Sequence, residues 1–277
     1  MFDLTVVLPT CNRAKLLREA IEQIVTGVRC ELELIVVDGA STDETPGVLE
    51  TARAKLGERL RVIRESTRGG FVRAANTGFR AATGRNLTWL NDDARPLPGS
   101  LDLAVEQIDA APEDVAFVAM FHRWHSLRNI AYQMHRGRRP YSLCHLRGTL
   151  YANFPVGRRL TFERLGYFDE GFYVAAADPD LSLKAWHAGM RIIPAYGAMI
   201  DHDEVDDPRR QADHPRAVTD NERLFDKWDL PAKDPFRNNF DPWRPCTLRG
   251  LRGAKVEVSL PLGRRKSERG ESVVKVT

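Results

Sequence analysis

Short apolar runs alternate with helix-length segments through the first hundred residues, and this alternation limits the possible folds more than any other feature. Runs of strand length occur at residues 4–8, 32–37, 60–64 and 86–90. Helices are expected between them at residues 13–25, 43–56 and 71–82. Strands that alternate with helices predict an α/β domain, in which a mostly parallel central sheet is flanked by helices.

The pattern changes after Pro98. Helices are expected at residues 101–110, 181–188 and 219–228, and strands at residues 115–121 and 191–194. The basic stretch that follows residue 121 is too irregular to be assigned. After residue 231 the content of Pro, Asn and Arg rises, which predicts an extended or weakly ordered tail.

Several classes of protein do not fit this sequence. The apolar runs are far shorter than the roughly 20 residues of a membrane-spanning helix, so no transmembrane helix is expected. No basic leader precedes the first strand, which makes the cytoplasm the expected location. The cysteines show no CxxC spacing, which argues against a zinc site or a disulfide framework. No GxGxxG motif follows the first strand, which argues against an NAD-dependent enzyme.

Basic side chains gather in two parts of the chain. Residues 245–277 hold eight Lys or Arg against three Glu, and residues 115–162 hold eight Arg and four His with no acidic residue. A solvated basic surface and an anion-binding surface both fit this composition. The tail lacks the interleaved aromatic side chains of nucleic-acid-binding proteins, so we expect no nucleic-acid partner.

Polar residues stand at the carboxyl ends of the expected strands. Thr10 and Asn12 follow the first strand, Asp38 follows the second, and residues 91–93, one Asn and two Asp, follow the fourth. Because ligands bind open α/β sheets at these ends, we expect the residues to converge in one crevice. Residues 91–93 offer the oxygen ligands that Mg²⁺ and Mn²⁺ prefer. Paired acids after a strand are equally typical of turns.

An ordered set of motifs extends from residue 2 to residue 202. It comprises VVLPTCNR at 6–13, IVVDGASTD at 35–43, GGFVRAANTG at 69–78, WLNDDA at 89–94, FDEGF at 168–172, DPDLSLK at 178–184, and His202. In this order the motifs resemble those of family-2 glycosyltransferases. The resemblance implies a GT-A-like, Rossmann-related single domain over residues 1–230, with a nucleotide-binding half at 1–98 and an acceptor-binding half at 99–230. A basic C-terminal extension would follow at 231–277.

The resemblance also implies a nucleotide site formed by the loops after the strands. Thr10, Asn12 and Arg13 match residues that line the base pocket. Asp38 matches a contact to the base or the ribose. The other residues that match nucleotide-facing positions are Arg68, Gly70, Arg73, Asn76, Asn91 and Asp92. A plain flexible turn explains the glycines equally well.

A divalent metal is implied beside the diphosphate. Asp93 matches the last acid of the family's DXD-type motif and is the expected metal ligand. His202 matches a histidine that approaches the metal or the diphosphate. Mn²⁺ or Mg²⁺ is therefore the expected cofactor. Asn91 is uncharged where the motif has an acid, so weak or ligand-dependent metal binding is expected.

The expected general base is Asp178, which would remove the proton of the attacking acceptor hydroxyl. It matches the second member of a Glu–Asp pair, whose first position is here Ala177. Together with a single base, the resemblance implies direct displacement with inversion at the anomeric carbon. The expected acceptor-binding residues are Trp124, Arg147 and Asp180. Asp180 is also positioned to cap the following helix.

The sequence therefore predicts a glycosyltransferase that moves a sugar from a UDP or dTDP donor to a saccharide, glycan or lipid-linked acceptor. The basic tail would permit peripheral contact with the inner face of a membrane. Ala177 and Asn91 depart from the family pattern and keep an alternative open. That alternative is a catalytically weak nucleotide-sugar-binding homologue that serves as a partner or regulatory subunit.

Overall fold

The helices and strands follow the predicted alternation through the first hundred residues. The computed structural model describes residues 2–123, 130–146, 149–203, 205–228 and 230, together with the strands at 243–249 and 255–261. The elements are β1 (Leu4–Thr10), α1 (Ala14–Gly27), β2 (Leu32–Asp38), α2 (Thr45–Leu56), η1 (Gly57–Arg59), β3 (Leu60–Arg64), α3 (Phe71–Ala81), β4 (Asn86–Trp89), β5 (Ala94–Pro96), α4 (Ser100–Ala110), β6 (Val115–Arg123), β7 (Ile130–Arg136), β8 (Arg139–Leu146), β9 (Thr149–Leu150), β10 (Pro155–Arg158), α5 (Arg159–Leu165), α6 (Ala177–His187), β11 (Arg191–His202), α7 (Pro208–Trp228), β12 (Trp243–Arg249) and β13 (Lys255–Pro261).

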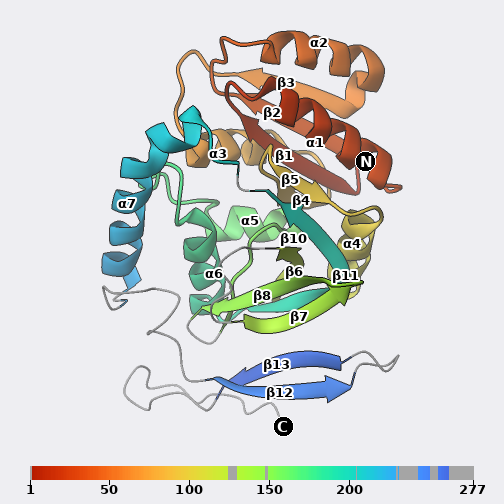
Figure 1. Ribbon diagram of the computed structural model, residues 1–277, viewed down its shortest axis with the longest axis vertical. Helices are drawn as coiled ribbons and strands as arrows, with labels where there is room; N and C mark the ends of the chain where they lie inside the picture. The colour runs from red at the N-terminus through yellow and green to blue at the C-terminus, as the bar shows by residue number, and fades with distance from the viewer. Residues whose placement is uncertain are drawn as a thin grey trace.

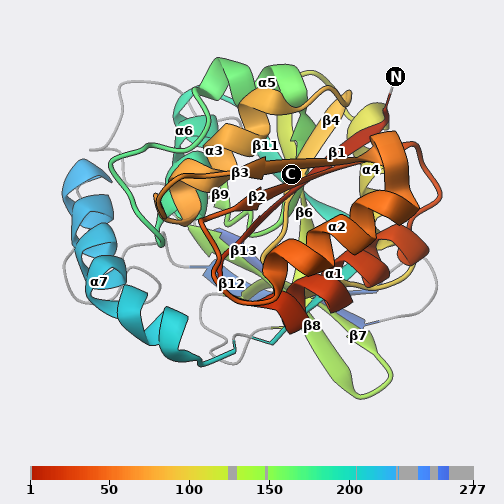
Figure 2. The ribbon, with the colours of Figure 1, turned by 90° about the horizontal axis from the view of Figure 1, so that it is seen from above.

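The N-terminal half contains the parallel part of the sheet. β1 pairs in parallel with β2 and β4, and β2 pairs in parallel with β3. Helices α1 and α2 lie on one face of these strands and α3 lies on the other (Figure 2). A Cβ atom on Gly78 of α3 would lie 2.3 Å from the Val7 side chain, so only glycine allows this close approach to β1. Because β1, β2 and β4 run parallel, their carboxyl ends meet at one edge of the sheet.

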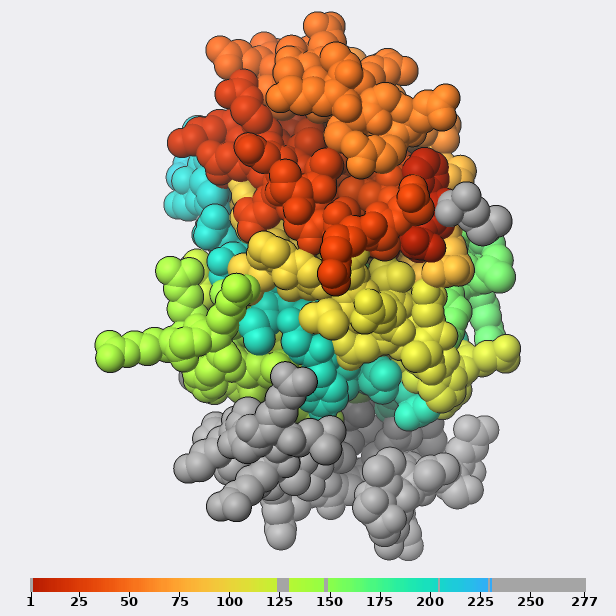
Figure 3. Space-filling model, turned by 90° about the vertical axis from the view of Figure 1, so that its right-hand side faces the viewer, coloured from red at the N-terminus to blue at the C-terminus, as the bar shows by residue number. Residues whose placement is uncertain are grey.

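The C-terminal half of the sheet is mixed. β10 runs antiparallel to β4 and β6, and β11 runs parallel to β6 but antiparallel to β5. The β7–β8 hairpin pairs with β6 and projects from the body of the molecule (Figures 2 and 3). Parallel pairing is thus concentrated in the N-terminal half, while the α/β class and the single central sheet are confirmed.

Three regions differ from the elements predicted. The strands β5 and β7–β10 and the helix α5 lie where no element was assigned, and α7 begins at Pro208 instead of residue 219. In the expected weakly ordered tail, β12 and β13 pair antiparallel, and β13 pairs with β7. None of the helices in the described part of the chain is long and apolar enough to cross a membrane.

Helix α7 runs along one side of the molecule beside α6 and α3 (Figure 1). Its buried Asp220 accepts hydrogen bonds from the backbone N–H groups of Tyr173, Val174 and Ala175 at 2.7–3.1 Å. Asp213, one helical turn from the start, forms an ion pair with Arg68. The helix is therefore attached both to Arg68, just before α3, and to the loop at residues 173–175, just before α6.

Candidate functional site

A cavity of about 350 Å³ lies at the carboxyl ends of β1 and β4, bordered by α3, α6 and α7. This volume is in the range of small-molecule sites. Eight of the residues predicted from the sequence line it: Thr10, Arg68, Gly70, Asn91, Asp92, Asp93, Asp178 and His202. The crevice predicted at the strand ends is therefore present.

The acidic pair at the end of β4 forms a turn and also faces the cavity. The N–H of Ala94 donates to the Asn91 carbonyl at 3.0 Å, which closes the turn around Asp92 and Asp93. The Thr10 hydroxyl, at the end of β1, donates to Asp92 Oδ2 at 2.9 Å. Each aspartate is only 2% exposed. The paired acids thus form the turn and also border the cavity.

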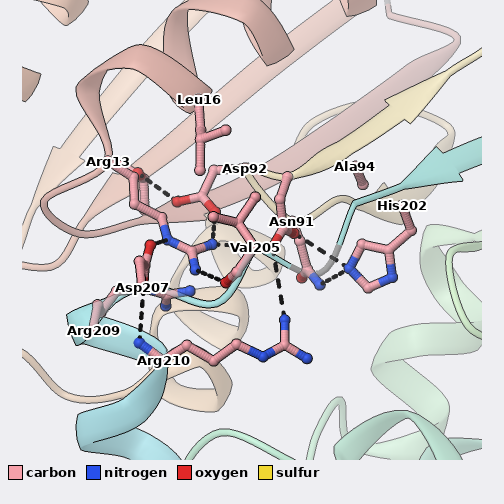
Figure 4. A network of polar contacts seen from close by, with 12 residues as sticks. Arg13, Leu16, Asn91, Asp92, Ala94, His202, Val205, Asp207, Arg209 and Arg210 are labelled. Atoms are coloured by element: carbon pink, nitrogen blue, oxygen red, sulfur yellow. Dashed lines mark hydrogen bonds and ion pairs between the residues drawn. The ribbon is translucent and has the colours of Figure 1, made fainter. Parts of the chain in front are cut away.

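Arg13 provides the positive charge that balances these acids. Its Nη1 lies 2.7 Å from Asp92 Oδ1 and 3.2 Å from Asp93 Oδ2, and its Nε lies 2.7 Å from Asp207 Oδ2 (Figure 4). Burial lowers the pKa of Arg13, but the paired carboxylates outweigh it and raise the pKa above its usual value. Arg13 is 4% exposed and does not line the cavity, and its predicted contact with the base stays a prediction.

The ladder between β5 and β11 brings His202 to the acidic turn. Ala94 pairs with His202, and the His202 Nε2 atom lies 3.3 Å from Asp93 Oδ1 and 3.4 Å from Asn91 Nδ2. Burial acts to raise the pKa of Asp93. The contact with His202 and the charges of Arg13 and Arg210 outweigh burial, so the pKa lies well below its usual range. Asp93 is therefore a carboxylate at neutral pH.

The pair formed by Asp93 and His202 fits a divalent cation. Asp93 Oδ1 is buried and accepts no hydrogen bond from the residues that the structure describes. Two ligand atoms 3.3 Å apart can share a cation held about 2.1 Å from each. Within the described ranges, no group of three or more His, Cys, Asp or Glu side chains has metal-binding geometry.

Asp178 lies across the cavity, in the first turn of α6. It is half-buried, and its Oδ2 atom accepts a hydrogen bond from the Tyr151 hydroxyl. Burial raises the pKa of Asp178 to about 6, against the opposite effect of Tyr151. Ala176, immediately before this helix, adopts a left-handed φ of 64°, a conformation that costs free energy in a non-glycine residue. A carboxylate that titrates near neutral pH suits a general base.

Two residues predicted at the nucleotide, Asn12 and Asp38, form hydrogen bonds with the loop after β2. Asn12 is exposed, and its Oδ1 atom accepts a hydrogen bond from the backbone N–H of Thr42 at 2.7 Å. Asp38 is 1% exposed, and its Oδ1 atom accepts a hydrogen bond from the N–H of Ser41 at 3.0 Å. Neither side chain is part of the cavity wall.

Two further predicted residues, Arg73 and Asn76 of α3, also lie outside the cavity wall. Arg73 points toward Glu65, with 3.8 Å between Nε and Oε1. The fully buried Asn76 exchanges two 3.0 Å hydrogen bonds with the backbone of Phe168. These residues contact the loops that border the cavity, and their contact with the nucleotide stays a prediction.

Asp180 anchors α7 to α6 and does not face an acceptor. It is fully buried, and it accepts a hydrogen bond from Trp228 Nε1 and an ion pair from Lys227, both at 2.8 Å. Because α6 begins at Ala177, Asp180 already lies within the helix and is not its cap. The other two residues expected at the acceptor, Trp124 and Arg147, lie outside the described residues.

The sequence analysis missed three cavity residues that matter for the charge and the chemistry of the site. Tyr151 contacts Asp178, and Arg209 and Arg210 enter from the first turn of α7. Pro208, immediately before the two arginines, is the helix-start signal that would have located them. Pro215, inside the same helix, concealed its continuity.

Comparisons with known proteins agree with the fold and the motif order. The model of glycosyl transferase family 2 matches residues 5–165, more than half of the 277 residues. The solved mannosyltransferase PcManGT from Pyrobaculum calidifontis, in complex with GDP-Man and Mn²⁺, is similar with a TM-score of 0.63 and 26% sequence identity. The match covers 85% of this chain and 67% of that chain.

Two curated bacterial relatives match shorter segments. A PGL/p-HBAD biosynthesis glycosyltransferase from Mycobacterium bovis is 37% identical over 89 residues, which cover 32% of this chain and 34% of the relative. A GalNAc(5)-diNAcBac-PP-undecaprenol beta-1,3-glucosyltransferase from Campylobacter jejuni is 32% identical over 108 residues, which cover 39% and 35%. The chain thus spans about a third of each relative's length. The predicted resemblance is confirmed, and the chain belongs to glycosyl transferase family 2.

Proposed function

We propose that the protein transfers a sugar from a nucleoside diphosphate donor to an acceptor hydroxyl, with inversion at the anomeric carbon. One observation carries the proposal: Asp93 and His202, which lie 3.3 Å apart and would fit a divalent cation, line the same cavity as Asp178, whose pKa is raised to about 6 by burial. Displacement of a diphosphate by a hydroxyl is favoured by positive charge at the leaving group and by a base at the attacking hydroxyl. The GDP-Man and Mn²⁺ complex of the similar mannosyltransferase supports it.

The donor diphosphate would lie between the acidic turn and α7. Asp93 and His202 would hold Mn²⁺ or Mg²⁺, which neutralises the charge that grows on the departing diphosphate. Arg209 and Arg210 line the same cavity and add positive charge, and Arg210 Nη1 is 3.9 Å from Asp93 Oδ2. A UDP or dTDP donor is favoured, as the family resemblance implies.

Asp178 would act on the acceptor side. Its carboxylate accepts the proton of the attacking hydroxyl while the bond between the sugar and the diphosphate breaks. Because burial raises its pKa to about 6, it is deprotonated at neutral pH and still basic enough to take the proton. The relative named for an undecaprenol-linked glycan supports a saccharide, glycan or lipid-linked acceptor.

A thermal-shift panel of UDP, GDP, CDP and dTDP sugars, with and without Mn²⁺, tests the proposal. A ligand that binds the folded state raises its stability by mass action, so the nucleotide that raises the melting temperature identifies the donor class. We expect a UDP or dTDP sugar to raise it, and Mn²⁺ to increase the effect. No shift with any of the four nucleotides would contradict the assignment. Stabilisation without turnover would favour the regulatory homologue.

A further inference from the structure

We propose that Tyr151 is a positioning residue that orients Asp178 and sustains its charge. The inference rests on the proposed role of Asp178 as the base. Tyr151 is 5% exposed, lines the cavity, and donates its hydroxyl hydrogen to Asp178 Oδ2.

The backbone around Tyr151 is fixed to the strand and helix on either side. The Tyr151 N–H donates to the Cys144 carbonyl at 2.8 Å, which ties it to β8. The next N–H, of Ala152, donates to Ser182 Oγ at 3.1 Å, and the Ser182 hydroxyl donates to the Asp178 carbonyl at 2.9 Å. Side-chain and main-chain hydrogen bonds therefore hold the Tyr151 hydroxyl next to the Asp178 carboxylate.

The hydrogen bond from Tyr151 matters more because the residue before Asp178 is Ala177. The family commonly has a Glu at this position, whereas the Ala177 side chain provides neither a carboxylate nor any other hydrogen-bonding group. A hydroxyl that donates to a carboxylate favours its charged form and so opposes the effect of burial on Asp178. Without Tyr151, the carboxylate would be free to rotate and would hold its proton to higher pH.

The chain offers a matched control for the test. Tyr141 is 1% exposed, and its hydroxyl also donates to an aspartate, Asp201, at 2.8 Å. Neither residue lines the cavity. Tyr141→Phe therefore removes the same kind of hydrogen bond from the same half of the protein without touching the proposed base. Thermal unfolding of both variants verifies that each still folds.

The first measurement is a carbon-13 NMR titration of the Asp carboxyl groups, in which the Asp178 signal is identified by its loss in Asp178→Asn. Tyr151→Phe should raise the pKa of Asp178 by about one unit, while Tyr141→Phe leaves it unchanged. An unchanged Asp178 titration in Tyr151→Phe, or the same shift in both variants, would overturn the inference.

The second measurement is the release of nucleoside diphosphate from the panel of UDP, GDP, CDP and dTDP sugars as a function of pH. A shift of about one pKa unit predicts a loss of about fivefold at pH 6 and little loss at pH 8, with the donor KM unchanged. Tyr151→Phe should cost nothing further in an Asp178→Asn background, whereas an added loss there would contradict the role. Full turnover by Asp178→Asn alone would instead refute the proposed base.

Discussion

The two carboxylate oxygens of Asp93 have different neighbours. Oδ2 faces Arg13 at 3.2 Å and Arg210 at 3.9 Å, whereas Oδ1 faces only His202 at 3.3 Å among the described side chains. One oxygen is therefore neutralised within the protein and the other remains for a cation. An internal arginine in this place compensates for the burial of two adjacent acids, because unpaired buried charges are costly.

Asp93→Asn should remove the metal-dependent part of nucleotide binding. The variant keeps the shape of the side chain but loses the charge at Oδ1, so Mn²⁺ affinity in the presence of UDP should fall by at least about tenfold. Thermal shifts with UDP in Mn²⁺ and in EDTA measure the effect. Asp114→Asn, which changes an exposed carboxylate paired with Arg191, is the control. An undiminished Mn²⁺ response in Asp93→Asn would contradict the assignment.

The raised pKa of Asp178 has a cost in stability that depends on pH. Burial raises this pKa from 3.8 to about 6, so the folded protein holds the proton more tightly than the unfolded chain. Stability is therefore lost as the pH rises through that interval. Asp178→Asn removes the titrating group and should be more stable than the parent at pH 8, by on the order of 2 kcal/mol, with little difference at pH 4. Urea unfolding at both pH values checks this, and a difference independent of pH would refute it.

At the scale of elements, α7 connects the two halves of the cavity. Its first turn carries Arg210 to the acidic turn, and Asp213 reaches Arg68 in front of α3. Farther along, Asp220 binds the 173–175 loop, and Trp228 donates to Asp180 of α6. A helix attached at both ends holds the arginines over the site and fixes the loop that leads into Asp178.

Asp220→Ala tests this connection. The substitution leaves three backbone N–H groups without their acceptor, so unfolding free energy should fall by about 2–4 kcal/mol. Loosening of the loop before α6 should also weaken nucleotide binding. Asp226→Ala, in the same helix but with an exposed side chain, should change neither property by a measurable amount. Urea unfolding measures the stability of both variants, and equal losses in the two would argue against the connection.

At the scale of the whole molecule, the sequence predicted the half whose elements are encoded locally. Strands such as 4–8 and 32–37 are short, apolar and bounded by turn residues, so their type follows from composition and period. In the other half, β10 pairs with β4 and β6, which lie far away in sequence, and no local pattern reports such pairing. β7 and β9 each pair with β8, their neighbour in sequence, but the Arg- and His-rich sequence of this region showed no clear strand pattern. The start of α7 was missed because residues 208–216 are almost entirely polar and include Pro215, so no apolar pattern marks them as helical.

The candidate site was predictable in the same uneven way. Residues that end strands, such as Thr10 and Asp93, line the cavity because the ends of parallel strands meet at one edge. Arg13 follows the same strand, yet it turns inward to the acids, and only the geometry of the loop decides which way it points. Tyr151 carries no motif of its own, and its place beside Asp178 results from tertiary packing.

The central claim is that one cavity binds the donor through the Asp93 side and reacts through Asp178. Its most direct test compares the parent with Asp178→Asn in two measurements. Calorimetry gives the affinity for UDP and dTDP in the presence of Mn²⁺, and a turnover assay gives the rate at which UDP or dTDP is released from the corresponding nucleotide sugars. The account predicts that Asp178→Asn binds the nucleotide as tightly as the parent while turnover falls at least about 100-fold. Turnover at the parental rate, or an equal loss of binding and turnover, would contradict it.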